Sequence, residues 1–161
     1  MELYFPAMLR IELTDWAAAR AEASGIRRTV FVQEQGVPEE LELDEHDALC
    51  LHALARDETG RAIGTARLLP PERHDGHVVG HVGRMAVLRP WRGRGIGGAL
   101  LERLIAAAAA RGDTELALSA QTHALAFYRA HGFAEEGDEF LEAGIRHRTM
   151  RRRLQPSRGN S

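Results

Sequence analysis

Arg92-Gly-Arg-Gly-Ile-Gly-Gly98 is the stretch of this 161-residue chain that decides its fold. It follows a predicted strand over residues 78–88 and opens a predicted helix that runs from about residue 95 to residue 111. Glycines let backbone N–H groups come close to a ligand, and the first turn of a helix offers unpaired N–H groups at the positive end of its dipole. Arg92 and Arg94 add positive charge. The stretch is therefore predicted to bind a pyrophosphate.

Other glycine-rich loops fit the surrounding residues less well. Gly93, Gly95 and Gly98 have the Gly-x-Gly-x-x-Gly spacing of a dinucleotide-binding loop, but the next strand ends in Ser119-Ala120, where that fold needs an acidic residue. Only one strand-helix-strand unit can be drawn. A P-loop needs a lysine, and the chain has none. A glycine turn without a ligand would weaken the start of the helix for no purpose, so it is the less favoured interpretation.

Outward from this loop, the apolar periodicity and the turn residues predict one mixed α/β domain over residues 1–154, with a flexible tail over 155–161. We expect strands over residues 8–13, 49–56, 62–69, 78–88 and 116–119, and a final hairpin of 133–135 with 140–151. We expect helices over 16–23 and 26–35, separated by Ser24-Gly25, and over 95–111 and 122–131. The acidic segment 39–47 is expected to be a solvated loop, and residues 70–76 a turn.

The composition limits the classes of function. Apolar residues make up 44% and charged residues 27%, as in globular proteins, and the net charge of −2 argues against general binding to nucleic acid. No apolar run is long enough to span a membrane, and the N-terminus lacks the pattern of a secretory signal. The single cysteine, Cys50, excludes an internal disulfide and favours a reducing, cytoplasmic location. Without lysine, Schiff-base chemistry on this chain is excluded.

Two motifs resemble the GNAT superfamily of N-acetyltransferases. Arg84-Met-Ala-Val-Leu-Arg-Pro-Trp-Arg-Gly-Arg-Gly-Ile-Gly97 is similar to its central motif, Arg/Gln-x-x-Gly-x-Gly/Ala after a strand, and Ala124-Leu-Ala-Phe-Tyr-Arg-Ala-His-Gly-Phe133 is similar to the motif that follows. The segments Val30 to Pro38, Asp44 to Asp47 and Glu142 to His147 further resemble the ElaA-like branch. The resemblance implies an α/β fold of GNAT type, with a mixed, mostly antiparallel sheet flanked by helices in a single domain.

The resemblance also implies a reaction and the residues that perform it. Acetyl-CoA is the implied co-substrate, with no metal, and its acetyl group passes to a primary amine of a small molecule or peptide by direct attack in a ternary complex. Tyr128 stands where the family often has the general acid that protonates the leaving thiolate, although it could instead be an aromatic residue packed beside Phe127. One backbone N–H of residues 85–87 would polarise the thioester carbonyl. The implied acetyl-CoA contacts are Met85, Ala86, Val87, Arg92, Gly93, Arg94, Gly95, Ile96, Gly97, Gly98, Gln121, Phe127 and Tyr128.

The attacking amine must lose a proton, and the chain offers several acceptors for it. The candidates are Glu34, Asp44, Glu45, His52 and His147, of which Glu34 and His147 are retained as the catalytic candidates. If the acidic segment 39–47 takes part, it favours a cationic acceptor such as a polyamine, an amino sugar or an N-terminus.

Two further points bear on partners. His74, His77 and His81 are close in sequence, but no metal-ligand pattern completes a site, so we expect surface or packed histidines. The alternative to an enzyme is a GNAT-fold module that binds acetyl-CoA without turnover, as a sensor or regulatory partner. Tyr128 and the candidate bases favour the enzyme. A homodimer is compatible with the family.

Overall fold

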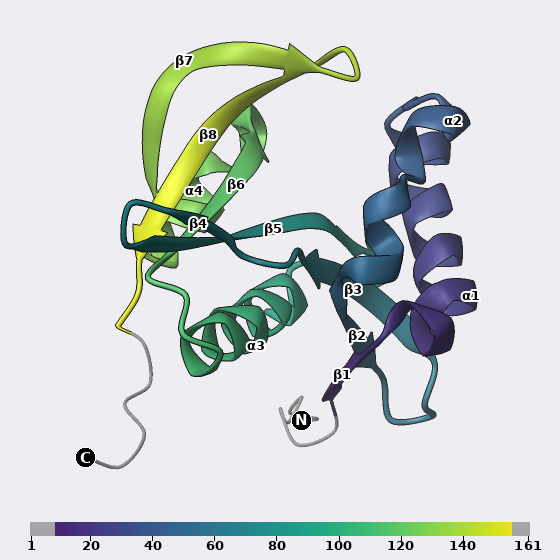
Figure 1. Cartoon of the computed structure of the whole chain (residues 1–161). Helices are drawn as coiled ribbons and strands as arrows, with labels where there is room; N and C mark the ends of the chain where they lie inside the picture. Colours follow the sequence, from purple (N-terminus) through teal and green to yellow (C-terminus); the bar gives the residue numbers. More distant parts are fainter. Residues whose placement is uncertain (1–8, 156–161) are drawn as a thin grey trace.

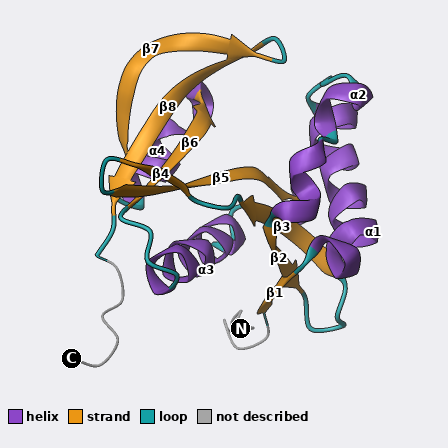
Figure 2. Ribbon diagram, in the orientation of Figure 1, coloured by secondary structure: helices purple, strands orange, loops and turns teal. Residues whose placement is uncertain are grey.

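A mixed β-sheet forms the centre of the computed structural model, which describes residues 9–155 (Figure 1, Figure 2). Its strands follow the order β1-β2-β3-β5-β6-β8-β7, with the short β4 paired to β5. The strands are β1 (Arg10–Thr14), β2 (Leu51–Arg56), β3 (Ala62–Leu68), β4 (Glu72–His74), β5 (His77–Val87), β6 (Glu115–Gln121), β7 (Ala134–Glu142) and β8 (Ile145–Arg153). Only β5 and β6 are parallel among these pairs. The predicted mostly antiparallel mixed sheet is confirmed.

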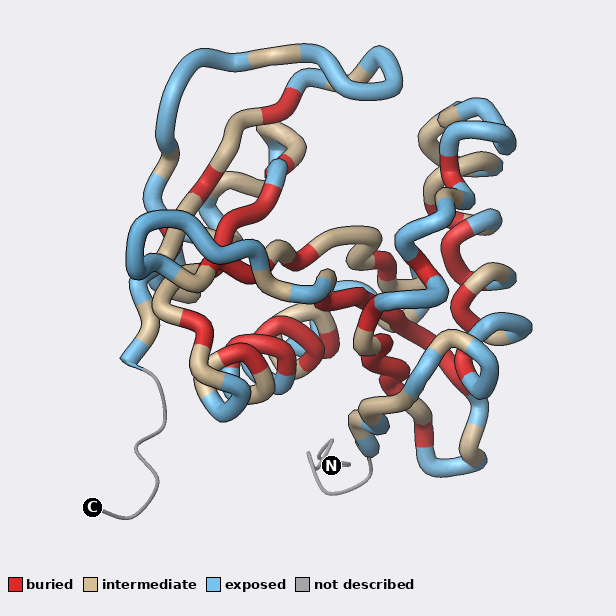
Figure 3. The backbone as a smooth tube through the Cα atoms, viewed as in Figure 1, coloured by how far each residue is buried: buried red, intermediate tan, exposed pale blue. Residues whose placement is uncertain are grey.

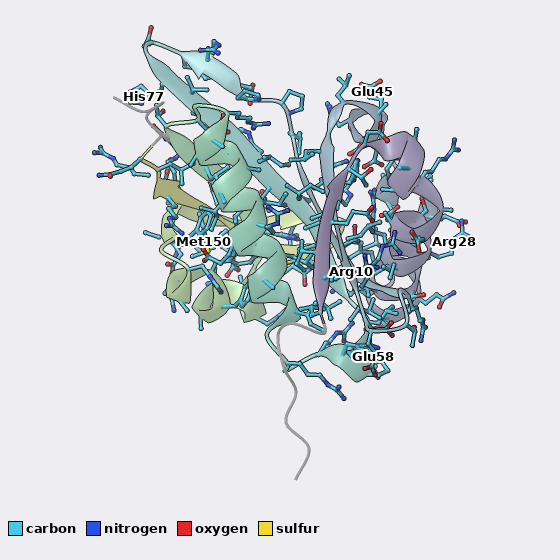
Figure 4. The ribbon with its side chains drawn as sticks, turned by 90° about the horizontal axis from the view of Figure 1, so that it is seen from below. Arg10, Arg28, Glu45, Glu58, His77 and Met150 are labelled. Atoms are coloured by element: carbon cyan, nitrogen blue, oxygen red, sulfur yellow. The ribbon has the colours of Figure 1, made fainter. Side chains whose placement is uncertain are left out.

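The two long helices cover opposite faces of the sheet (Figure 1). Alternate residues of β2 explain this, because neighbouring side chains of a strand point to opposite faces. Ala53 and Ala55 pack in the core that contains α3 (Ile96–Ala110), whereas Leu54 packs against α1 (Trp16–Arg27). Figure 3 shows the buried inner side of α3, and Figure 4 shows Met150 of β8 beside that helix. The remaining helical segments are η2 (Arg28–Glu34), α2 (Glu39–Glu42), η3 (Glu45–Leu49), η4 (Arg89–Trp91), η5 (Thr122–Ala124) and α4 (Leu125–Ala130).

The predicted break between two N-terminal helices at Ser24-Gly25 is wrong. Helix α1 runs through both residues and continues directly into η2, a π-helical segment. A stripe of four buried side chains, Ala19, Ala23, Ile26 and Val30, recurs at helical spacing across the expected break. Burial of such a stripe outweighs the ~1 kcal/mol by which one glycine weakens a helix.

Two other local predictions are corrected. Strand β7 extends unbroken through residues 136–139, because a register shift between Glu136 and Phe140 absorbs the polar residues as a bulge, and the hairpin turns instead at Ala143-Gly144. The expected turn over residues 70–76 contains β4. Of the predicted domain, residues 1–8 lie outside the described residues, as does the tail from residue 156 onward.

The acidic segment 39–47 was expected to be a solvated loop, and this is also wrong. It contains α2 and the start of η3, and the side chains of Glu42 and Asp47 are buried. Both carboxylates accept hydrogen bonds from the buried Arg27 of α1. The pairing explains the burial, since a charge leaves water only where another charge or a hydrogen bond compensates it.

Gly80→Ala is expected to destabilise the fold by about 1–3 kcal/mol. A Cβ at Gly80 would lie 2.2 Å from Oδ2 of the fully buried Asp113 and 2.8 Å from Nη2 of its partner Arg111. Gly83→Ala on the same strand is the control, because no heavy atom lies within 4 Å of that Cβ. Urea denaturation of both variants measures the difference, and equal losses would contradict this packing.

Candidate functional site

The site is a cleft that opens where β5 and β6 separate. The two strands pair only over Val79–His81 and Glu115–Ala117, and beyond this point β5 pairs with β3 on its other side. A cavity of about 870 Å³ occupies the opening and is lined by residues of both strands, among them Met85 and Gln121. Along this stretch, backbone groups on the inner side of β5 have no strand partner within residues 9–155. They can therefore bind an extended ligand as an added strand would.

A bulge at Arg84 shapes the β5 wall of this cavity. The pairing of β3 with β5 shifts register between Thr65 and Arg67, and Arg84 has a left-handed φ of 50°. For a residue other than glycine this conformation costs about 1–3 kcal/mol, so the surroundings must hold it. The Arg84 side chain donates to the carbonyl of Glu42 and to the carboxylate of Asp44. Sequence reasoning missed this residue, although it opens the motif before the glycine loop.

Gly93 and Gly95 form an open loop at the start of α3. Their φ angles of 79° and 81° lie in the left-handed region that glycine adopts without strain. A Cβ at either residue would meet no heavy atom within 4 Å, so the loop faces open space. Because α3 begins at Ile96 without a side-chain cap, the N–H groups of its first turn remain available for an anion. This arrangement suits a pyrophosphate.

Gly97 and Gly98 serve a second purpose, which is the close packing of α3 with the α4 segment. A Cβ at Gly97 would lie 3.5 Å from Phe127, and a Cβ at Gly98 would lie 3.2 Å from Nε2 of His131. Phe127 and Met85 both pack against the main hydrophobic core. Gly97 and Gly98 therefore allow the motif of residues 124–133 to pack against the motif of residues 84–97.

The two arginines of the loop are held by the protein. Arg92 donates from Nε to the Val87 carbonyl and from Nη2 to Glu34 at 2.8 Å, while the Arg94 guanidinium stacks on Trp91 at 4.9 Å. The hydrogen bond from Arg92 holds the pKa of Glu34 below its usual range. Glu34 is consequently a weak base that fixes Arg92 beside the cavity.

Tyr128 lines the cavity from α4. Its ring meets Phe127 and Phe133 edge-on, with centroid distances of 5.0 and 6.1 Å. Burial raises the pKa of the Tyr128 phenol to about 12, so the group keeps its proton at neutral pH. Within residues 9–155 no hydrogen bond engages its hydroxyl, which is therefore available to a ligand.

His147 lines the same cavity from β8 and has a defined tautomer. Its Nδ1 lies 2.7 Å from the Ile145 carbonyl, which can only accept, so Nδ1 bears the proton of the neutral ring. Nε2 then carries a lone pair and lies 4.0 Å from a carboxylate oxygen of Glu142. Phe140 stacks on the ring and fixes its orientation.

Of the five candidate bases only His147 lines the cavity, and the remaining four, Glu34, Asp44, Glu45 and His52, do not. His52 is buried with Nε2 2.8 Å from the Asp47 carbonyl, and burial lowers its pKa. Glu45 is exposed at the outer side of the helical layer (Figure 4). Asp44 is engaged by arginines, as described below.

Gln121 is joined to Gln35 across the cavity. The Gln121 amide donates to the Gln35 side chain at 2.9 Å and receives a longer bond in return, and its oxygen also lies 2.6 Å from Nε2 of His123. The pair connects the residue that follows η2 to the end of β6.

Three arginines and three carboxylates form a partly buried arginine–carboxylate cluster beside the cavity. Asp47 bridges two arginines and Asp44 bridges a different pair, with N–O distances of 2.7 to 3.2 Å. The three positive and three negative formal charges of the cluster sum to zero. The members are Arg27, Arg67, Arg84, Glu42, Asp44 and Asp47.

The cluster predicts a pH-dependent stability. Burial raises the pKa of Asp44, but the hydrogen bonds and charges of Arg67 and Arg84 outweigh it and lower the value to about 2. Unfolded aspartate titrates near pH ~3.9, so the contribution of Asp44 is complete above that pH and is lost as the pH falls toward about 2. The stability gap between wild type and Asp44→Asn should narrow by about 1–2 kcal/mol between pH ~5 and ~2.5. Urea denaturation across this range measures it, and a constant gap would contradict the ion pairs.

Of the histidines considered as metal ligands, His74 ends β4, whereas His77 and His81 lie on β5, and His81 also lines the cavity. His77 contacts Glu115 at 2.8 Å, and His81 lies 3.6 Å from Glu72. In residues 9–155 no cluster of three or more potential ligand side chains is placed to hold a metal.

No helix within residues 9–155 has the length and apolar character to cross a membrane.

Comparisons with known proteins agree with this geometry. A family model described as an acetyltransferase (GNAT) domain matches residues 17–154. The uncharacterized N-acetyltransferase YjcF of Bacillus subtilis is 38% identical over 130 residues, which are 80% of this chain and 89% of that protein. An acyl-CoA N-acyltransferase from Pseudomonas aeruginosa has a TM-score of 0.77 and 35% identity, covering 89% of this chain and 99% of the other. Escherichia coli ElaA has a TM-score of 0.75 and 25% identity, covering 90% and 99%.

Proposed function

The chain belongs to the GNAT family of acetyltransferases, and from this premise we propose that it transfers the acetyl group of acetyl-CoA to a primary amine of a small molecule or peptide. One observation carries the proposal. The phenol of Tyr128 and the imidazole of His147 line one cavity, at the point where β5 leaves β6, and Arg92 at the start of the glycine loop lines it too. A proton donor and a proton acceptor thus line the same cavity.

The donor substrate fits the β5 side of the cleft. We assign its pyrophosphate to the first turn of α3 and the loop of Gly93 and Gly95, where N–H groups meet open space. Its pantetheine arm would run along the unpaired inner side of β5 at Met85–Val87, with Phe127 beside it. An N–H group there would donate to the thioester oxygen as negative charge develops.

The transfer needs two proton movements, and the cavity supplies a group for each. His147 Nε2 accepts a proton from the amine, whose nitrogen attacks the thioester carbonyl directly. The C–S bond then breaks, and the Tyr128 hydroxyl protonates the leaving thiolate. Tyr128 regains a proton from solvent and His147 releases its own, which restores both groups. Bringing both reactants into one cavity removes the need for a covalent intermediate on the protein.

His147→Gln is expected to lower kcat at least about 10-fold with little change in the affinity for acetyl-CoA. Glutamine retains hydrogen bonding but cannot accept the proton. Glu34→Gln serves as the comparison, because Glu34 is held by Arg92 and is expected to matter less for kcat. A larger kcat loss in Glu34→Gln than in His147→Gln would indicate that Glu34, and not His147, is the general base.

The alternative is a module that binds acetyl-CoA without turnover. Release of free thiol from acetyl-CoA, followed across a broad panel of primary amines, separates the two. The proposal predicts amine-dependent release above hydrolysis for at least one class of amine. Tight acetyl-CoA binding with no release across the panel would support the module. We expect the reaction in the cytoplasm.

A further inference from the structure

The arginine–carboxylate cluster presents its positive side to the cavity. Arg67, Arg84 and Glu42 line the cavity, whereas Asp44 and Asp47 do not. Glu42 is already engaged by the buried Arg27. The cluster as a whole is neutral, but the wall that a substrate meets carries two guanidinium groups.

One N–H donor of Arg67, at Nε, has no hydrogen-bond partner within the described residues. Its Nη1 donates to Asp44 and Asp47 and its Nη2 donates to Asp44, while the side chain is 94% buried. Nε is nevertheless a buried N–H of a charged group. Buried donors are nearly always satisfied, which points to a partner that arrives from the cavity.

Arg84 adds to the same positive wall. Burial lowers the pKa of its guanidinium, and the neighbouring charge of Arg67 acts in the same direction. Its backbone is held in the left-handed bulge beside the cavity. An oxyanion at this wall would meet two arginines at once.

The hairpin side of the cavity has the opposite character. Glu142 and His147 line it from β7 and β8, and their side chains lie 4.0 Å apart. Phe31, Val37 and Leu41 contribute apolar surface from the helical side. A molecule with an ammonium group at one end, a carboxylate at the other and an apolar side chain would match all three surfaces.

We propose that Arg67 and Arg84 form a carboxylate subsite, so that the amine acceptor is a free amino acid or a similar amine that bears a carboxylate. This inference rests on the proposed transfer reaction. It replaces the polyamine suggested by the acidic segment, because the buried carboxylates of that segment are already bound to arginines. The subsite would orient the amine toward His147 and the thioester.

Matched acceptors test the subsite in the wild-type protein. The probes are phenylalanine, phenylalaninamide and phenethylamine, with the corresponding compounds of leucine and lysine. We expect kcat/KM to be at least about 30-fold higher for the amino acid than for its amide or decarboxylated amine in at least one series, a discrimination of ~2 kcal/mol. Amides and amines that react as well as the acids in every series would overturn the subsite.

A variant connects this preference to the wall. Arg84→Met should bring the amino acid to within about 5-fold of its amide, while acetyl-CoA affinity stays within about 3-fold of wild type. Arg84→Lys should retain part of the preference. A preference that survives unchanged in a folded Arg84→Met would refute the role of Arg84.

Binding separates failure of the subsite from failure of the proposed reaction. Calorimetric titration of the same probes into the protein saturated with CoA, which has no acetyl group to transfer, reports acceptor binding without turnover. Carboxylate-dependent binding without thiol release would uphold the subsite and refute the transfer reaction. Thiol release or binding that does not depend on the carboxylate would refute the subsite alone, and so would the absence of binding by every probe.

Discussion

Gly95→Asp is expected to weaken acetyl-CoA binding at least about 100-fold, whereas Gly95→Asn should weaken it less than about 10-fold. Both side chains tolerate the left-handed backbone that Gly95 adopts at a φ of 81°, and the space around its Cβ is open. They are nearly equal in size and differ by one charge. A carboxylate at the start of α3 would repel the pyrophosphate that we place there, and ~2.7 kcal/mol corresponds to the expected factor.

Isothermal titration calorimetry measures this difference, and thermal unfolding confirms that both variants fold. S-acetylpantetheine provides a further control because it lacks the pyrophosphate. The two variants should bind it equally. Equal affinities of the two variants for acetyl-CoA would show that the pyrophosphate lies elsewhere.

Tyr128→Phe is expected to lower kcat about 100- to 1,000-fold while the affinity for acetyl-CoA changes less than about 3-fold. Phenylalanine keeps the edge-on contacts with Phe127 and Phe133, so the change removes only the hydroxyl. Burial raises the pKa of Tyr128 to about 12, so the wild-type phenol carries its proton at neutral pH.

Rapid-mixing measurements of thiol release, made with enzyme in excess over acetyl-CoA, report this step before product release. Calorimetry on the same variant reports acetyl-CoA affinity. A loss of affinity with an unchanged chemical rate would assign Tyr128 to binding. An unchanged rate and an unchanged affinity would show that Tyr128 only packs in the core and has no part in catalysis.

The central part of the fold could be predicted from the sequence because its signals are local. The left-handed turns at Gly93 and Gly95 require glycine, and the apolar stripe of α3 has helical spacing, so the strand-loop-helix unit is encoded within about twenty residues. The same holds for Tyr128, which lies five residues before Phe133 in a recognisable motif. Its raised pKa comes from neighbours that only the fold assembles.

Features that depend on distant partners could not be predicted. Nothing local distinguishes Glu42 and Asp47 from solvated acidic residues, because their partner Arg27 comes 15 and 20 residues earlier, on another helix. Gly25 is a helix breaker by local preference, yet burial on both sides of it keeps α1 intact. The bulge at Arg84 likewise arises from the register of β5 on β3.

A single turnover with acetyl-CoA labelled in its acetyl carbonyl is the most direct test of the proposed reaction. Protein in slight excess is mixed with the labelled donor and a responsive amino acid, and the products are followed by mass spectrometry. Direct transfer predicts one labelled N-acetyl group on the acceptor for each CoA released, with no labelled protein at any time. Labelled acetate beside unmodified acceptor, or acetyl-CoA that stays bound and unchanged, would contradict it.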